Sequence, residues 1–174
     1  DHTELKRNEG LRVHSPGLLL AQTLRADVQH KLADGWVSQR YGEKRPAPAL
    51  RSTIKSSNAN FDTLLLPWRD IEPTVHLEDV AVEARGANIT APSALRINLQ
   101  SGDKRTTDFW FHSHDKEVLN WRIDRFEFTG RWVFWREADY GRVLHAVSHS
   151  GASLRSTQNG RTAQIALEIE GTIA

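Results

Sequence analysis

Short runs in which apolar and polar residues alternate recur along most of this chain, and they limit the folds that are open to it. Leu95–Gln100 places leucine and isoleucine at every second position, between arginine, asparagine and glutamine. The same alternation occurs at Val80–Glu83, at Thr107–Phe111 and at Arg125–Phe128. A period of two puts the apolar side chains on one face of a β-strand. No stretch of the sequence sustains a helical period of 3.6, so the pattern predicts an all-β chain.

Turn signals separate these runs at roughly ten-residue intervals. Ser15–Gly17 divides Leu11–His14 from Leu18–Thr23, which predicts a hairpin, and Ser101–Lys104 and Thr129–Arg131 are similar breaks. Roughly a dozen short strands at this spacing are typical of a sandwich or a barrel. We therefore predict an antiparallel β-sandwich of two sheets.

The length of 174 residues suits one domain and is too short for two ordinary ones. We expect a polar leader with a frayed start over residues 1–10 and a single sandwich domain over residues 11–174. Lys and Arg total 23 against 22 Asp and Glu, which argues against a dedicated nucleic-acid binder. No apolar run approaches the length that spans a bilayer, so we expect no membrane partner.

The sequence contains no cysteine, which excludes disulfides and thiolate metal sites. It also contains no methionine, not even at position 1. We therefore expect a processed product or the C-terminal part of a longer parent chain, whose other part could hold the chemistry.

Gly35–Leu50 gathers aromatic, cationic and turn-forming residues into one stretch. Gly35 and Gly42 bracket Trp36 and Tyr41, which predicts a loop held in a fixed shape. Prolines in the second half of the stretch fix φ and bias the residues before them toward extended conformations.

Strands are predicted after this stretch. Leu50–Ile54 alternates like a strand, whereas Asp27–Leu32, on the N-terminal side, fits either a short strand or one helical turn. Phe61–Leu66 is apolar nearly throughout, which predicts a strand buried on both faces that ends at Pro67.

The same stretch holds the candidate binding residues for an acidic sugar, namely Trp36, Arg40, Tyr41, Lys44 and Arg45. Arginine offers a two-pronged donor to a carboxylate or sulfate, and flat aromatic faces suit the apolar face of a pyranose. The alternative is that Trp36 and Trp68 fill a core between sheets. We interpret the other four tryptophans as core or rim packing: Trp110, Trp121, Trp132 and Trp135.

His112 and His114 are the candidate metal ligands, because residues two apart in a strand point to one face. The alternative is that they are surface histidines at a strand end, since no third ligand is fixed by the sequence. We expect a turn to separate His145 from His149.

Two adjacent charged pairs also stand out in this part of the chain. We interpret Asp124-Arg125 and Arg136-Glu137 as exposed ion pairs, each of which contributes little to stability.

Several motifs resemble one family. Gly35-Trp36-Val37-Ser38, Tyr41-Gly42, Pro46-Ala47-Pro48 and Phe61-Asp62-Thr63-Leu64-Leu65-Leu66-Pro67 resemble the C-terminal β-domain of heparinase II/III-like polysaccharide lyases. Thr107-Asp108-Phe109 and Tyr140-Gly141-Arg142-Val143-Leu144 are similar to that domain's closing hairpins. The resemblance covers most of residues 10–155 and rests on structural motifs, not catalytic ones.

The resemblance implies a parent enzyme that cleaves uronic-acid polysaccharides, such as glycosaminoglycan or alginate, by β-elimination in the periplasm or outside the cell. It also implies that an upstream helical toroid is a partner and supplies most catalytic groups. Zinc in that family is bound earlier in the β-domain, so we expect zinc in the parent and no cofactor here. Tyr41 with Arg40 and His30 is the local trio with suitable acid-base chemistry, and the alternative makes Tyr41 a structural aromatic beside a tight turn.

Three hypotheses follow. The chain is the scaffold and substrate-channel wall of such a lyase, a carbohydrate-binding module without catalytic activity, or a structural domain that mates with a neighbour. A sheet face rich in exposed aromatics and cations would favour binding, and a large bare apolar patch would favour a neighbouring domain.

Overall fold

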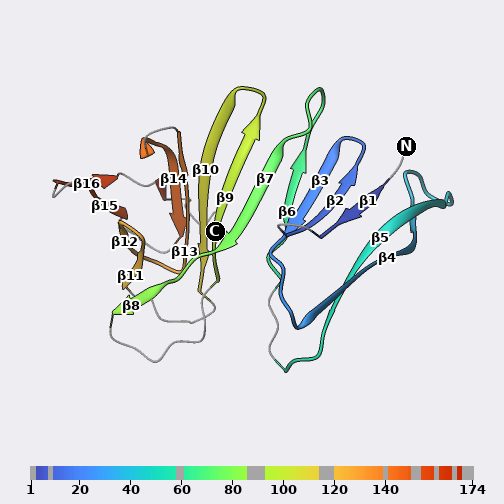
Figure 1. The fold of residues 1–174 in the computed structure, drawn as a ribbon, viewed down its shortest axis with the longest axis horizontal. Helices are drawn as coiled ribbons and strands as arrows, with labels where there is room; N and C mark the ends of the chain where they lie inside the picture. The colour runs from blue at the N-terminus through green and yellow to red at the C-terminus, as the bar shows by residue number, and fades with distance from the viewer. Residues whose placement is uncertain are drawn as a thin grey trace. The chain divides into compact units, whose positions relative to one another are not determined.

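A computed structural model describes residues 3–7, 10–57, 61–85, 93–113, 120–138, 141–149, 154–158, 161–165 and 168–169. The predicted all-β fold is confirmed (Figure 1). The strands are β1 (Glu4–Lys6), β2 (Leu11–Ser15), β3 (Leu18–Gln22), β4 (Val28–Val37), β5 (Arg45–Ile54), β6 (Leu64–Pro67), β7 (Thr74–Asp79), β8 (Glu83–Arg85), β9 (Ser93–Ser101), β10 (Lys104–His112), β11 (Asn120–Ile123), β12 (Phe126–Thr129), β13 (Trp132–Glu137), β14 (Val143–His149), β15 (Leu154–Gln158), β16 (Arg161–Ile165) and β17 (Glu168–Ile169). Among the described residues there is no helix long and apolar enough to cross a membrane.

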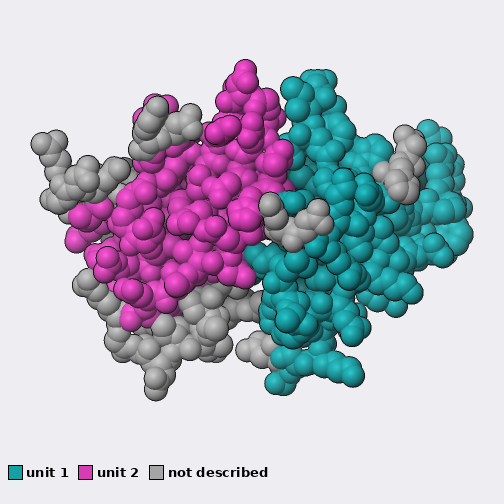
Figure 2. Space-filling view, in the orientation of Figure 1, with its two compact units in different colours: residues 1–73 teal, residues 74–174 magenta. Residues whose placement is uncertain are grey.

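The chain separates into two compact units, residues 1–73 and residues 74–174 (Figure 2). Unit 1 holds a four-stranded sheet in the order β1-β2-β3-β6 and a two-stranded sheet of β4 and β5. Unit 2 holds a six-stranded sheet, β17-β14-β13-β10-β9-β7, and a five-stranded sheet, β16-β15-β12-β11-β8. The expected single domain over residues 11–174 falls across both units and stays a prediction.

Unit 1 is built around the β2–β3 hairpin that the sequence predicts. Leu11 pairs with Gln22 and Ser15 pairs with Leu18 across the turn. Leu11 and Val13 are buried at alternate positions of β2, and Leu19 and Ala21 at alternate positions of β3. Leu19 is opposite His14, so the two pairs lie on opposite faces of the hairpin. The residues expected to form a separate polar leader include β1, which pairs with β2 from Glu4 to Lys6. The paired part of this segment belongs to the sheet because its backbone continues the ladder.

The prediction for Phe61–Leu66 is wrong in both length and burial. Only Leu64–Pro67 forms a strand, β6, and its residues alternate between half-buried and exposed. Leu65 is 56% exposed because β6 is the outer strand of its sheet and pairs with β3 alone. Pro67 is tolerated at its end because an outer strand has one edge without ladder partners.

The loop predicted between Gly35 and Gly42 is only partly one, because Gly35–Val37 belongs to a strand and the turn of a long β-hairpin follows it. β4 and β5 pair continuously from Val28 opposite Ile54 to Val37 opposite Arg45. Each strand has 10 residues, so the hairpin is about 33 Å long at 3.3 Å per residue. We call this two-stranded element the arm. The arm also decides between the two predictions for Asp27–Leu32, because most of this range is strand and not helix.

Unit 2 contains the predicted two-sheet sandwich. Its core combines residues of the six-stranded sheet with residues of the five-stranded sheet: Ala94, Phe109, Phe111, Val133, Trp135 and Ala146 from the first, and Trp121, Ile123, Phe126, Phe128 and Leu154 from the second. The rings interlock, since Phe109 stacks on Trp135 with centroids 4.6 Å apart. The buried Trp121 indole donates to the Gly130 carbonyl at 2.9 Å, so this large side chain leaves no unpaired polar group.

Candidate functional site

The turn end of the arm is a tight, well-defined corner. The Glu43 amide donates to the Arg40 carbonyl at 3.2 Å, and the Ser38 hydroxyl donates to the same carbonyl at 2.7 Å. Gly42 has a φ of 82°, which is the third-position conformation of a type II turn. Tyr41 therefore occupies the second corner position, where its side chain points away from the ribbon.

The arm brings all five candidate binding residues to this one end. Tyr41 is 107% exposed and Trp36 is 68% exposed. The three cationic candidates, Arg40, Lys44 and Arg45, are exposed as well. The alternative in which Trp36 fills a core is thus wrong, because most of its side chain is exposed. Trp68, by contrast, is half-buried.

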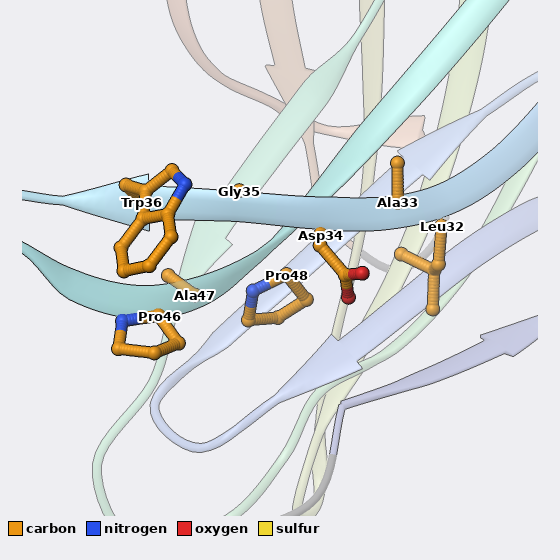
Figure 3. Close-up of a pocket in the computed structure, with 8 residues that line it drawn as sticks. All are labelled: Leu32, Ala33, Asp34, Gly35, Trp36, Pro46, Ala47 and Pro48. Carbon is orange, nitrogen blue, oxygen red and sulfur yellow. The ribbon is translucent and has the colours of Figure 1, made fainter.

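An open hollow of about 560 Å³ lies along the arm beside these residues (Figure 3). It is lined by both strands: Leu32, Ala33, Asp34, Gly35 and Trp36 from β4, and Pro46, Ala47 and Pro48 from β5. Trp36 is paired with Pro46, and Asp34 with Pro48, so these four side chains share one face of the ribbon. That face offers a flat, largely apolar surface beside one carboxylate.

The charge at the turn end is positive. Glu43 approaches Arg45 at 3.6 Å, in a pair whose side chains are 65% and 46% exposed for Arg45 and Glu43. No carboxylate of the described residues pairs with Arg40 or Lys44. Arg45 lies opposite Val37, so it is on the face of the ribbon away from Trp36. A flexible polyanion can contact both only by passing over the end or edge of the arm.

His30 is not part of this cluster. It lies near the other end of β4, six residues before Trp36, which is roughly 20 Å along a strand. Its side chain is buried, with Nδ1 2.9 Å from the Ser52 hydroxyl. The trio of Tyr41, Arg40 and His30 therefore does not converge, although Arg40 and Tyr41 are neighbours at the turn.

The described residues hold no cluster of three or more His, Asp or Glu side chains suited to a metal ion. His112 is the last residue of β10, and His114 lies outside the described residues. The prediction of a turn between His145 and His149 is wrong, because both belong to β14. Strand β14 is continuous there because it pairs with β13 along this whole length.

The Asp124-Arg125 contact is present at 4.0 Å, but Arg125 has a closer partner elsewhere. The predicted Arg136-Glu137 pair is wrong, because the partner of Arg136 is Asp108. Arg125 donates to Glu137 at 2.7 Å, and the Glu137 side chain is 7% exposed. Arg136 makes two hydrogen bonds to Asp108 at 2.7 Å and 2.6 Å, and the Asp108 side chain is 5% exposed. Hydrogen bonding to Asp108 raises the pKa of Arg136. Adjacent residues of a strand point to opposite faces, and this rule would have separated Arg136 from Glu137 in the sequence.

The remaining tryptophans divide as predicted between core and rim. Trp121 and Trp135 are buried, whereas Trp110 and Trp132 are half-buried and stack with centroids 5.6 Å apart. These four residues stabilise the sandwich and its rim, and the exposed tryptophan of the described chain is Trp36.

No protein-family model, curated protein or solved structure matches this chain. Any functional assignment must therefore come from the geometry of the site and the motifs of the sequence.

Proposed function

We propose that the chain binds an acidic polysaccharide through the turn end of the arm. The observation that carries this proposal is the exposure of Trp36, Arg40, Tyr41, Lys44 and Arg45 within one hairpin end. Exposed cations attract carboxylate or sulfate groups, and exposed aromatic rings stack on pyranose faces. Exposed apolar side chains that gather in one place also mark binding surfaces more often than scattered ones do.

We further propose that the chain is the scaffold and channel wall of a heparinase II/III-like polysaccharide lyase. The motif resemblance supports this role, and the separation of His30 from Tyr41 supports a non-catalytic one for the chain itself. In this proposal an upstream helical toroid supplies the base, the acid and the group that neutralises the uronate, and zinc belongs to the parent. The exposed arm suits the second candidate equally, a carbohydrate-binding module with no catalytic partner.

The binding test compares two triple variants with the same loss of charge. Arg40→Ala, Lys44→Ala, Arg45→Ala removes the arm cations, and Lys104→Ala, Arg105→Ala, Arg122→Ala removes exposed cations of unit 2. Binding of heparan-type and alginate-type oligosaccharides is measured by calorimetry at several salt concentrations. The arm triple should weaken binding roughly tenfold, since exposed charges contribute about 0.2–1 kcal/mol each.

Salt should reduce binding of the wild-type chain steeply and binding of the arm triple only slightly. Trp36→Ala should weaken binding at both low and high salt, because stacking is not screened. Equal losses in the two triples would show that attraction to the arm is not specific and would contradict the proposal.

A further inference from the structure

The position of the arm depends on what holds its root, the end formed by Val28–Leu32 and Leu50–Ile54. In the described chain, β4 and β5 pair with each other and with no third strand. An isolated two-stranded hairpin is at best marginally stable in water. The root residues on the face of Leu32 and Leu50 are buried or half-buried, so contacts on this face must fix the arm.

A continuous chain of side-chain hydrogen bonds connects this face of the arm to the four-stranded sheet. His30 Nδ1 lies 2.9 Å from the Ser52 hydroxyl on the paired strand. Ser52 donates to Gln22 Oε1 on β3 at 3.3 Å. Gln22 Nε2 then donates to the Thr63 hydroxyl, just before β6, at 2.6 Å. These bonds join the arm to β3 and, through Gln22, to the residue that precedes β6.

The hydrogen-bond directions assign the proton on His30. Ser52 has one hydroxyl hydrogen and donates it to Gln22, so its oxygen accepts from His30 Nδ1–H. Neutral His30 then carries its hydrogen on Nδ1, and Nε2 is the bare nitrogen. This Nε2 is buried and has no hydrogen-bond partner among the residues that the structure describes. Protonation must occur there, and it would create a buried N–H group without an acceptor.

The surroundings of His30 oppose a second positive charge. Arg7 donates to the His30 carbonyl from the segment after β1. Burial lowers the pKa of His30, and the positive charge of Arg7 lowers it further. The next two side chains in this chain of hydrogen bonds, Ser52 and Gln22, are neutral. The neighbouring cations Lys31 and Arg51 lie opposite each other in the β4–β5 ladder, and their side chains are on the other face of the ribbon.

We infer that the His30–Ser52–Gln22–Thr63 chain is a proton-sensitive latch, and that protonation of His30 loosens the arm from the four-stranded sheet. The sign follows from linkage. A histidine whose pKa is lower in the closed state than its ordinary value of 6.5 stabilises that state fully above 6.5. This stabilisation is lost as the pH falls from 6.5 toward the lowered pKa. The inference does not depend on what the arm binds.

Hydrogen-exchange mass spectrometry of the whole chain tests the latch at about pH 7.5 and about pH 5, with labelling times scaled for intrinsic exchange. Amides of β4 and β5 should exchange at least about fivefold faster at the acidic pH, the lower end of usual coupling between linked sites. Amides of the β2–β3 hairpin should change less. Equal protection of the arm at both pH values would overturn the inference.

Two variants separate the latch from general acid effects. His30→Gln keeps a donor toward Ser52 and cannot titrate, so its arm should stay protected at both pH values. His145→Gln removes an exposed histidine of β14 and should keep the full pH response. A pH response that survives in His30→Gln would overturn the inference.

A measurement on the wild-type chain removes any dependence on how well His30→Gln folds. The imidazole resonances of His30 are titrated by NMR, and the arm's exchange rates are measured at the same series of pH values. The two transitions should share one midpoint below the ordinary histidine value. Midpoints that differ would show that another group controls the arm.

Discussion

Replacing Arg125 by methionine should destabilise unit 2 by about 3 kcal/mol, because it removes the cation that faces a buried carboxylate. The Arg125–Glu137 distance is 2.7 Å, and the two side chains are 24% and 7% exposed. Without Arg125, the donor that Glu137 keeps among the described residues is the Trp135 indole, at 3.3 Å. Removing one partner of a fully buried pair costs about 3–5 kcal/mol, and the slight exposure of Glu137 favours the lower end of that range.

The reverse change, Glu137→Met, should cost less, about 1–2 kcal/mol. Arg125 is the more exposed partner, and it keeps the Gly141 carbonyl at 3.4 Å and Asp124 at 4.0 Å. The double variant should be more stable than Arg125→Met alone, because it leaves no buried charge without a partner. The loss of stability should therefore be larger when the arginine is replaced than when the glutamate is replaced.

Urea unfolding followed by tryptophan fluorescence measures these differences, since Trp121 and Trp135 lie in the core of unit 2. Arg122→Met is the matched control, because its partner Glu83 is 3.9 Å away and the two side chains are 52% and 75% exposed. This control should cost less than about 1 kcal/mol. If Arg125→Met costs no more than Arg122→Met, or less than Glu137→Met, the reasoning from burial is refuted.

Three further outcomes are expected. Gly42→Val should lower the stability of the arm by about 1–3 kcal/mol through backbone strain alone, since its φ is 82° and an added Cβ would meet no described residue within 4 Å apart from its chain neighbours. An unchanged melting temperature would contradict this. Gly35→Ala should destabilise by a similar amount, about 1–3 kcal/mol, for a different reason, because its Cβ would lie 2.9 Å from both the Ala47 oxygen and the Ala49 Cβ; arm amides that exchange no faster than wild type would argue against it. The chain by itself should form no ultraviolet-absorbing unsaturated uronate from uronate polymers, because its local acid-base candidates do not converge; measurable turnover would end the scaffold proposal.

The sequence alone determined the secondary structure where one face of a strand is buried. Leu95–Gln100 lies inside β9, because a half-buried strand requires alternation. Leu11–Gln22 forms the β2–β3 hairpin, because Pro16-Gly17 suits a tight turn. The binding candidates of the arm were also visible, since exposed aromatic and cationic residues near a turn need no tertiary context. Gly42 fits the same account, because its position in the turn demands a positive φ.

The arm shows where local signals misled. Gly35 and Gly42 favoured a loop, yet Gly35 lies within β4. Pro46 and Pro48 predicted extended backbone only, and both lie within β5. They are two residues apart, so their missing N–H groups face the same edge of the strand. That edge has no partner strand among the described residues, and proline is tolerated there. Whether a strand has one neighbour or two is a property of the assembled sheet.

Only the tertiary structure decided which distant residues meet. β3 pairs with β6 although the whole arm separates them in the sequence, and this pairing makes Leu64–Pro67 an outer strand instead of a buried one. Arg125 finds Glu137 on another strand, and His30 reaches Gln22 through Ser52. Ladder hydrogen bonds and ion pairs between separate strands leave no periodic trace in the sequence, because each partner's local pattern is the same whichever strand lies beside it.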